Sequence, residues 1–353
     1  MGKYTAIDDP SAYFQTALYT GNAGFNTITN DGNSDLAPDF IWGKCRSTTK
    51  THFLYDTTRG AEKRLESDNT GAEDSNTNGI LNFYTDGFRT ASGNTENDNG
   101  ESYVAWQWKA NGGTTSSNTD GNITSTVQVN SDANFSIVTY TGNFTATQTV
   151  GHGLGVRPDV VIIKNRSGAN DWVVWTSELT SGNFMKLNAT DAQSSSSRIY
   201  QDGFTTSTFG IGANNTVNKN SNNYVAYCFN NVQGYSKFGK YVGNGNNSGP
   251  YIHLGFRPAF IMTKKSDGTS GWFMQDIKRG IKNNDTNTPV LQANGSFSEA
   301  TVGFTDYEID FLSNGFKLRD DNTYVNASNQ EYAYMAFAEH PFVTSTGIPT
   351  TAR

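Results

Sequence analysis

An internal repeat constrains this chain more than any other feature of its sequence. A proline, a short apolar run and a lysine recur at a fixed offset, as Pro38 with Lys44, Pro158 with Lys164, and Pro258 with Lys264. Further landmarks keep one order around each copy: a Tyr-x-Gly-Asn motif upstream, then an aromatic run, a Gly-Phe turn and a closing aromatic run downstream. Several landmarks in one order indicate tandem structural units. The sequence therefore predicts three copies.

The local pattern within each copy is typical of β-structure. Short runs of Val, Ile, Tyr, Phe, Trp and Thr alternate with Asn, Gly, Asp and Ser clusters. The turn glycines, which accept a positive φ in tight hairpins, are Gly87, Gly203 and Gly315. The closing runs alternate strictly, so every second residue of each run is expected on a core face, including Trp108, Phe229 and Phe337. We expect an all-β fold of three tandem β-sandwich, jelly-roll or lectin-like repeats, each of about 100 residues.

Composition suggests where the copies end. The Gly/Ser/Thr/Asn-rich stretch 113–133 has the composition of a linker, so repeat 1 is expected at 1–112 and repeat 2 at 134–234. Repeat 3 is expected at 235–343. The tail 344–353 has no apolar periodicity, and we expect it to be disordered alone or to form an arm in an assembly.

Several classes of protein are disfavoured by the ends, the charge and the cysteines. The N-terminus has no apolar signal-peptide region, and no apolar run is long enough for a transmembrane helix, so membrane insertion is not expected. A net charge of −7 argues against nucleic-acid binding. Cys45 and Cys228 fit no disulfide or zinc pattern and are expected to be free thiols of a protein made in a reducing cytosol.

Nothing in the sequence indicates catalysis, a metal or a cofactor. The four histidines do not lie at ligand spacing with Cys or Asp, and no Gly-x-Ser-x-Gly motif occurs. The loop 320–326 has oxygen ligands that suit calcium, but its composition is equally that of a turn. The repeated lysines are expected to be solvated charges at strand ends. Sugar-stacking is conceivable for Trp42, Trp172, Trp175 and Trp272, but strand positions favour the core.

With these landmarks assembled, the chain resembles a family of repeat-built structural proteins of marine tailed bacteriophages. The motifs that carry this resemblance span 135–142, 151–159, 224–229, 234–239, 310–317 and 334–339. The resemblance implies a virion location, in tail-fibre-like or other particle-surface proteins built of β-sandwich modules, and implies no catalytic residues. Copy 1 departs most, because Leu36-Ala-Pro38 lacks the Leu-Gly-x-Arg-Pro of the other copies.

These observations lead to one functional hypothesis and two alternatives. We expect a non-enzymatic virion structural protein, made in the host cytoplasm, in a tail fibre or appendage that attaches to the host surface. Its expected partners are other virion proteins, further copies of the chain in a homo-oligomer, and a host cell-surface glycan. The alternatives are a capsid decoration protein and a glycan-binding or glycan-degrading module.

Overall fold

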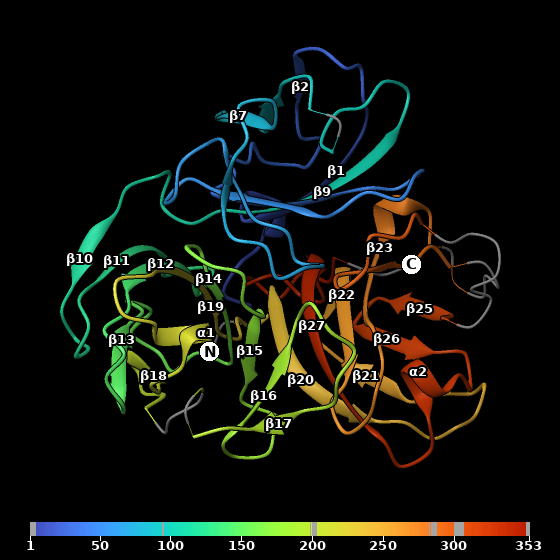
Figure 1. The fold of residues 1–353 in the computed structure, drawn as a ribbon. Helices are drawn as coiled ribbons and strands as arrows, with labels where there is room; N and C mark the ends of the chain where they lie inside the picture. The colour runs from blue at the N-terminus through green and yellow to red at the C-terminus, as the bar shows by residue number, and fades with distance from the viewer. Residues whose placement is uncertain are drawn as a thin grey trace.

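The computed structural model describes residues 5–93, 95–197, 199, 203–281, 283, 288–299 and 307–350. The chain is built almost wholly of antiparallel strands, so the all-β prediction is confirmed. Within these ranges the two α-helices, α1 (Asn215–Asn218) and α2 (Thr323–Asn326), have four residues each. No helix of the described residues has the length and apolar character needed to cross a bilayer. Figure 1 shows three lobes that meet at the centre of the molecule.

Lobe 1, blue to cyan in Figure 1, follows the short 3-10 helix η1 (Pro10–Ala12). It carries a sheet in the order β1-β9-β3-β4, a smaller sheet in the order β2-β8-β7, and the separate pair β5-β6. Its strands are β1 (Phe14–Thr20), β2 (Asn26–Ile28), β3 (Phe40–Cys45), β4 (Phe53–Asp56), β5 (Lys63–Arg64), β6 (Asp74–Ser75), β7 (Ile80–Phe83), β8 (Phe88–Thr90) and β9 (Ser102–Trp108).

Lobe 2, green to yellow in Figure 1, contains the widest sheet. Eight strands follow the order β10-β11-β12-β19-β14-β15-β16-β17, and β13 pairs with β18 in a second sheet. Its strands are β10 (Ser116–Asn118), β11 (Ser125–Asn130), β12 (Phe135–Thr141), β13 (Gln148–Gly151), β14 (Val160–Asn165), β15 (Val173–Thr176), β16 (Asn183–Lys186), β17 (Ser194–Ser195), β18 (Thr208–Ile211) and β19 (Asn223–Phe229).

Lobe 3, orange to red in Figure 1, contains a five-stranded sheet in the order β20-β27-β22-β23-β24 and a three-stranded sheet in the order β21-β26-β25. The 3-10 helix η2 (Ile277–Arg279) follows β23. Its strands are β20 (Ser236–Val242), β21 (Tyr251–His253), β22 (Phe256–Lys265), β23 (Trp272–Asp276), β24 (Leu291–Gln292), β25 (Ile309–Leu312), β26 (Gly315–Leu318) and β27 (Glu331–Pro341).

Four strands occur in the same spatial order in every lobe. These sets are β1-β9-β3-β4, β12-β19-β14-β15 and β20-β27-β22-β23. The closing strand of each copy, β9, β19 or β27, lies inside its sheet and pairs on both sides. Both of its faces are covered, so the strict alternation read from the sequence separates two cores rather than core from solvent.

One face of each closing strand points to a core that all three lobes share. Trp108, Phe229 and Phe337 are buried and contact one another there, with ring centroids 6.4, 5.4 and 5.8 Å apart. Burying a large aromatic side chain contributes about 1.5–3 kcal/mol. Because each ring is covered by residues of the other two lobes, this part of the folding free energy belongs to the three lobes jointly.

The opposite face of each large sheet packs on the smaller sheet of its own lobe. Three separate apolar clusters fill these spaces, one per lobe. Tyr103 and Ala105 lie in the cluster of lobe 1, and Tyr224 and Cys228 in that of lobe 2. Each lobe is thus a small sandwich that is joined to its neighbours through the shared core.

The repeated prolines lie where a missing backbone N–H does least harm. Pro38 and Pro158 precede β3 and β14, whereas Pro258 lies inside β22. A proline cannot donate a ladder hydrogen bond and is tolerated within a sheet mainly at bulges. The pairing of β22 with β27 shifts register on both sides of Pro258, so this proline occupies a bulge.

The turn glycines are explained by two different constraints. Gly87 has a φ of +97°, as predicted for these turns. Gly315 does not lie in the left-handed region, but a Cβ added there would be 2.1 Å from the carbonyl oxygen of Ile252 in β21. A Cβ added at Gly203 would be 3.0 Å from the Cα of Gly210. The rest of this turn, 200–202, lies outside the described residues. Close approach of a neighbouring strand therefore supplements the turn geometry.

The stretches expected to be linker and tail both make ordered contacts. Within 113–133, β10 and β11 pair with each other, and β11 pairs with β12, which widens the sheet of lobe 2. In the tail, the backbone N–H of Ser345 donates to Asp8 at 2.6 Å. The described part of the tail therefore lies against the start of the chain, while 351–353 lie outside the described residues.

Candidate functional site

The repeated lysines are buried, so the expectation of solvated strand-end charges is wrong. Lys44, Lys164 and Lys264 each have 0% of their surface exposed. A strand end is exposed in an isolated sheet, but a neighbouring lobe covers it in this fold. The Nζ of Lys164 donates to Thr70 O of lobe 1 at 3.0 Å, and that of Lys264 to Thr190 O of lobe 2 at 3.2 Å.

Burial has a clear electrostatic cost for these lysines. Loss of hydration disfavours the ammonium and lowers the pKa of each to about 8. Backbone carbonyls accept from all three, including Cys45 O from Lys44 at 2.7 Å. Lys164 and Lys264 bond across joints between lobes, whereas Lys44 bonds within lobe 1, and we assign all three a structural role.

A ring N–H crosses each interface at an equivalent position. Trp172 Nε1 donates to Glu66 O at 2.8 Å, and Trp272 Nε1 donates to Lys186 O at 2.9 Å. At the joint between lobes 3 and 1 the residue in this place is His52, whose Nε2 lies 2.9 Å from Gln292 O. The same contact therefore closes the ring of lobes at all three interfaces.

The tautomer of His52 follows from its second partner. Trp42 Nε1 donates to His52 Nδ1 at 3.0 Å, so Nδ1 is the acceptor and Nε2 carries the proton given to Gln292. Burial first, and the charge of Lys44 second, lower the pKa of His52 to about 3. This histidine is neutral and structural over the ordinary pH range.

A network of buried charges joins lobes 1 and 2, at what we call the 1–2 interface. Arg59 Nε lies 2.5 Å from Asp56 Oδ2, and Arg59 Nη1 lies 2.9 Å from Glu73 Oε2, with the Arg59 side chain fully buried. From lobe 2, Arg166 reaches Glu73 through two bonds of 2.8 and 2.9 Å, and Tyr227 donates to Asp56 at 2.8 Å. Burial opposes ionisation of Glu73, but the bond from Arg166 and the charge of Arg59 outweigh it and hold its pKa below the usual value.

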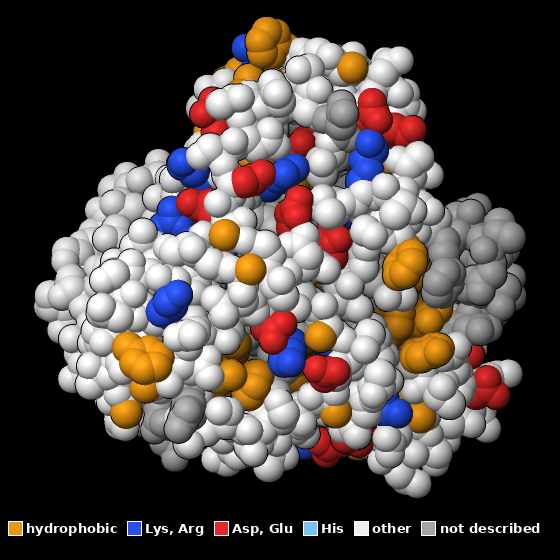
Figure 2. Space-filling view, viewed as in Figure 1, with side chains coloured by type: hydrophobic (Ala, Val, Ile, Leu, Met, Phe, Trp, Pro, Cys, Tyr) orange, Lys and Arg blue, Asp and Glu red, His pale blue; other side chains and the backbone are white. Residues whose placement is uncertain are grey.

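The joint between lobes 3 and 1, the 3–1 interface, repeats this network with equivalent residues. Arg279 Nε lies 2.6 Å from Asp276 Oδ2, and Arg279 Nη1 lies 3.4 Å from Glu299 Oε1. From lobe 1, Arg46 Nε lies 2.5 Å from Glu299, and Trp106 Nε1 donates to Asp276 at 2.9 Å. On the face shown in Figure 2, acidic and basic side chains gather where lobe 1 meets the other two lobes.

The joint between lobes 2 and 3, the 2–3 interface, has neutral residues at all five places. They are Thr176, Leu179, Gln193, Ser266 and Met335, in the order of Asp56, Arg59, Glu73, Arg166 and Tyr227. The underlying backbone contact is kept, since Gln193 N donates to Ser266 O at 2.8 Å and Glu73 N donates to Arg166 O at 2.9 Å. The motif Asp-x-x-Arg occurs at 56–59 and at 276–279, the two places where the network forms. The motif alone does not indicate a buried network, because the network also needs residues of a neighbouring lobe.

The outer end of each lobe is organised by one buried asparagine. Asn97, Asn218 and Asn326 are fully buried, and each accepts from the backbone N–H of the Asn in the Tyr-x-Gly-Asn motif, at 2.8–3.0 Å. Beside them, the motif tyrosine stacks on the tyrosine of the closing strand at 4.9–5.0 Å in every lobe. The calcium alternative for 320–326 gains no support, because Asp320 and Asn322 accept from backbone N–H groups that shape the turn before α2.

The loop after each motif passes through the left-handed region at one equivalent residue. This residue is Ala23 in lobe 1, Phe144 in lobe 2 and Gly245 in lobe 3, with φ of 50°, 55° and 62°. Its N–H donates to the carbonyl of the buried asparagine at 2.8–2.9 Å each time. An L-residue in this conformation costs about 1–2 kcal/mol, which glycine avoids.

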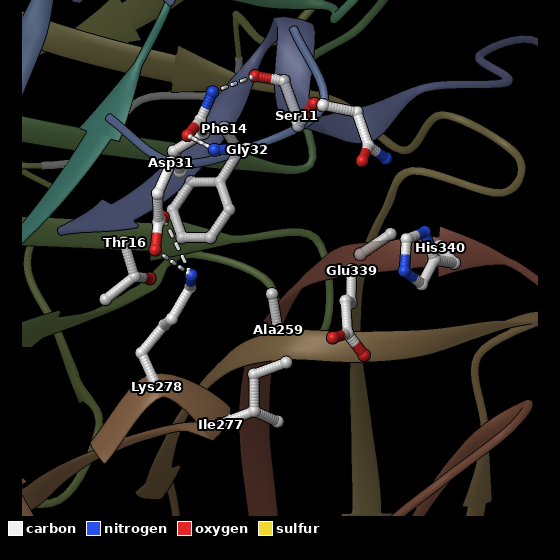
Figure 3. A pocket seen from close by; sticks show the side chains of 13 residues that line it. Ser11, Phe14, Thr16, Asp31, Gly32, Ala259, Ile277, Lys278, Glu339 and His340 are labelled. Atoms are coloured by element: carbon white, nitrogen blue, oxygen red, sulfur yellow. Dashed lines mark hydrogen bonds and ion pairs between the residues drawn. The ribbon is translucent and has the colours of Figure 1, made fainter. Parts of the chain in front are cut away.

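A hollow with a volume of about 190 Å³ lies between lobes 1 and 3. Figure 3 shows Asp31 and Lys278 on one side and Glu339 and His340 on the other, with Phe14 between. Lys278 Nζ lies 2.7 Å from Asp31, and Arg257 Nε lies 2.9 Å from Glu339. Both carboxylates are thus ion-paired rather than poised as a free acid or base.

The remaining residues singled out from the sequence are structural as well. Trp42, Trp172, Trp175 and Trp272 are at most 5% exposed, so they are core residues and not sugar platforms. Both cysteines are buried and free. In the described part of the chain, no group of three or more His, Cys, Asp or Glu lies together as a metal site.

The fold and these joints define a class: an all-β chain whose three lobes share one core. Its sequence matches the family model described as a domain of unknown function, DUF7483, over residues 9–341, and the chain therefore belongs to that family. Neither a curated protein nor a solved structure matches it.

Proposed function

We propose that the chain is a non-enzymatic structural protein at the surface of a bacteriophage particle, in a tail fibre or related appendage that attaches to the host. The observation that carries this proposal is the single core formed by Trp108, Phe229 and Phe337. A shared core holds the outer loops of three lobes in a fixed mutual arrangement. Fixed, repeated display suits attachment, because several weak contacts made together give high avidity.

The chemistry of the described residues is consistent with this role. Buried charges are used at the joints, where Arg59 and Arg279 each bind two carboxylates. The carboxylates of the hollow between lobes 1 and 3 are ion-paired. The resemblance to structural proteins of marine tailed phages supports the same role and adds a homo-oligomer, other virion proteins and a host glycan as proposed partners.

Cryo-electron microscopy of intact particles tests this proposal directly. We expect density for the three-lobed chain at the tail, in a small symmetric set of copies. Density spread over the capsid would make it a decoration protein instead, and copy number would separate the two positions. Absence of the chain from the particle would contradict both structural roles, and release of oligosaccharide from host glycan by the purified chain would contradict the non-enzymatic one.

A further inference from the structure

Phe144 occupies a backbone position that folding does not require a phenylalanine to fill. Its φ is 55°, and the equivalent positions hold Ala23 and Gly245. The fold therefore accepts a methyl group or no side chain there. A bulky residue in the left-handed region is strained, and strain of this kind gathers at functional positions.

The Phe144 ring contributes little to the core that could offset this strain. It is 49% exposed, and no aromatic ring of the described residues stacks on it. Elsewhere in lobe 2, Tyr140 and Phe209 are buried with centroids 6.2 Å apart, which is how this lobe uses aromatic residues for stability. Phe144 is thus a large apolar surface presented to solvent.

The backbone beneath the ring is held firmly. Phe144 N donates to Asn218 O at 2.9 Å, and Asn143 N donates to Asn218 Oδ1 at 2.8 Å. The Asn218 amide donates in turn to Thr145 O at 2.9 Å, and Asn218 itself is fully buried. The ring therefore projects from a fixed support, which limits the entropy lost when a ligand is bound.

The residues next to Phe144 in the loop are mostly polar, and none of them is charged. Residues 141–149 read Thr-Gly-Asn-Phe-Thr-Ala-Thr-Gln-Thr, and 143–147 are exposed. Amide and hydroxyl groups thus flank the ring, and α1 beneath carries no charge before Lys219. A pyranose sugar has complementary chemistry, with an apolar C–H face that stacks on an aromatic ring and a rim of hydroxyls that bond to amides.

We propose that the loop 142–148 is a binding site for a neutral glycan, with the Phe144 ring as the stacking platform and Asn143, Thr145 and Thr147 as its polar rim. The site names a ligand class for the surface protein proposed above and rests on that proposal only for its biological setting. A protein partner fits less well, because the hot spot of a protein interface is surrounded by further apolar contacts. Phe144 is flanked by Asn143 and Thr145 instead.

Lobe 1 provides a matched control. Phe25 is also an exposed aromatic in the loop after the motif, at 68% exposure. Its φ is not positive, and the guanidinium carbon of Arg89 lies 4.3 Å from the centre of its ring. A cation already covers one face of that ring, so we expect no sugar stacking there.

Saturation-transfer NMR and calorimetry on the purified full chain test the site, with gluco-, manno- and galacto-hexaoses as probes. We expect the wild-type chain to bind at least one hexaose, with the strongest transfer at ring C–H protons. Phe144→Ala, which copies the residue of lobe 1, should weaken binding at least tenfold, whereas Phe144→Tyr and Phe25→Ala should leave it within about twofold. Phe144→Gly should abolish binding while raising Tm by about 2 °C or leaving it unchanged, since strain is relieved.

Two results would overturn the site. One is the failure of the wild-type chain to bind any of the three hexaoses at millimolar concentration. The other is binding that Phe144→Ala leaves intact. Both concern the isolated chain, so they are distinct from absence of the chain in particles, which would contradict the proposed function and leave the glycan site standing.

Discussion

The 1–2 and 2–3 interfaces join lobes of the same topology through the same backbone contact. The 1–2 interface contains a buried charge network, whereas the 2–3 interface has neutral residues at the equivalent places. At the first, Asp56, Arg59 and Glu73 of lobe 1 meet Arg166 of lobe 2. At the second, the equivalent places hold Thr176, Leu179, Gln193 and Ser266. Neighbouring positions have changed together, and the fifth has changed from Tyr227 to Met335.

The difference teaches that the charges are not needed to define the joint. A buried ion pair roughly breaks even against well-packed neutral residues, but removal of one partner leaves an uncompensated charge. The residues of such a network are therefore expected to be exchanged as a set. A single chain in which two joints have the charge network and one lacks it allows this expectation to be tested without a second protein.

The largest expected effect is the loss of one carboxylate from the 1–2 interface. Asp56→Ala leaves the Arg59 guanidinium buried with one fewer partner and should lower the free energy of unfolding by about 3–5 kcal/mol. Thr176→Ala, the same change at the 2–3 interface, should cost about 1 kcal/mol or less. Urea unfolding followed by tryptophan fluorescence measures both free energies. Equal losses in the two variants would show that the charge network stabilises its interface no more than the neutral residues stabilise theirs.

Acid should weaken the 3–1 interface through His52. Its folded pKa of about 3 lies below the ordinary value of 6.5, so the unfolded chain binds the proton more readily and stability is lost as the pH falls through this window. Between pH 6 and 4 this group should lower the free energy of unfolding by about 2 kcal/mol.

The double variant Trp42→Met with His52→Trp copies the pair Met262 and Trp272 of lobe 3, and so keeps the packed volume nearly constant. It should retain its stability at pH 7 and show a shallower loss between pH 6 and 4. Denaturant titrations at each pH measure this slope. A slope identical to that of the wild-type chain would remove His52 as its source.

A smaller effect is expected when the whole charged set is replaced. The five-residue variant Asp56→Thr, Arg59→Leu, Glu73→Gln, Arg166→Ser and Tyr227→Met gives the 1–2 interface the residues of the 2–3 interface. Its free energy of unfolding should lie within about 2 kcal/mol of the wild-type value, and above that of Asp56→Ala. Greater loss than in the single variant would mean that the backbone of the joint depends on the charges.

The smallest effect is that of salt. The Arg166 and Glu73 side chains are 19% and 12% exposed, so ions reach this pair only in part. Raising NaCl to about 1 M should lower the stability of the wild-type chain, relative to the five-residue variant, by about 0.5 kcal/mol. The comparison between the two chains cancels the general effect of salt on apolar burial, and a difference of zero would indicate that the pair is fully shielded.

Much of the fold could be predicted because the alternation of residues along a strand indicates which of its faces is buried. The alternation in the closing strands correctly indicated that Trp108, Phe229 and Phe337 lie in a core. The pattern could not indicate that these residues lie in the same core, because contacts between copies do not change the periodicity of the sequence. For the same reason Lys44, Lys164 and Lys264 were expected in solvent and are buried.

The candidate glycan site lay beyond sequence reasoning for a different reason. Phe144 is one of many aromatic residues, and its exposure and positive φ become visible only in the structure. The buried asparagines could have been found, because Asn94-Thr-Glu-Asn97 and Asn215-Thr-Val-Asn218 are similar four-residue runs. Their role still depends on the loop that folds over them.

The core that the three lobes share also affects when the chain can fold during its synthesis. Phe14 of β1 packs on Trp108 and on Phe337, so β1 meets one of its main partners only after more than three hundred further residues have been added to the chain. Until residue 337 emerges from the ribosome, the core-facing sides of the large sheets of lobes 1 and 2 are not covered by lobe 3. We therefore expect the unfinished polypeptide to need shelter from aggregation, and its final compaction to follow translation rather than accompany it.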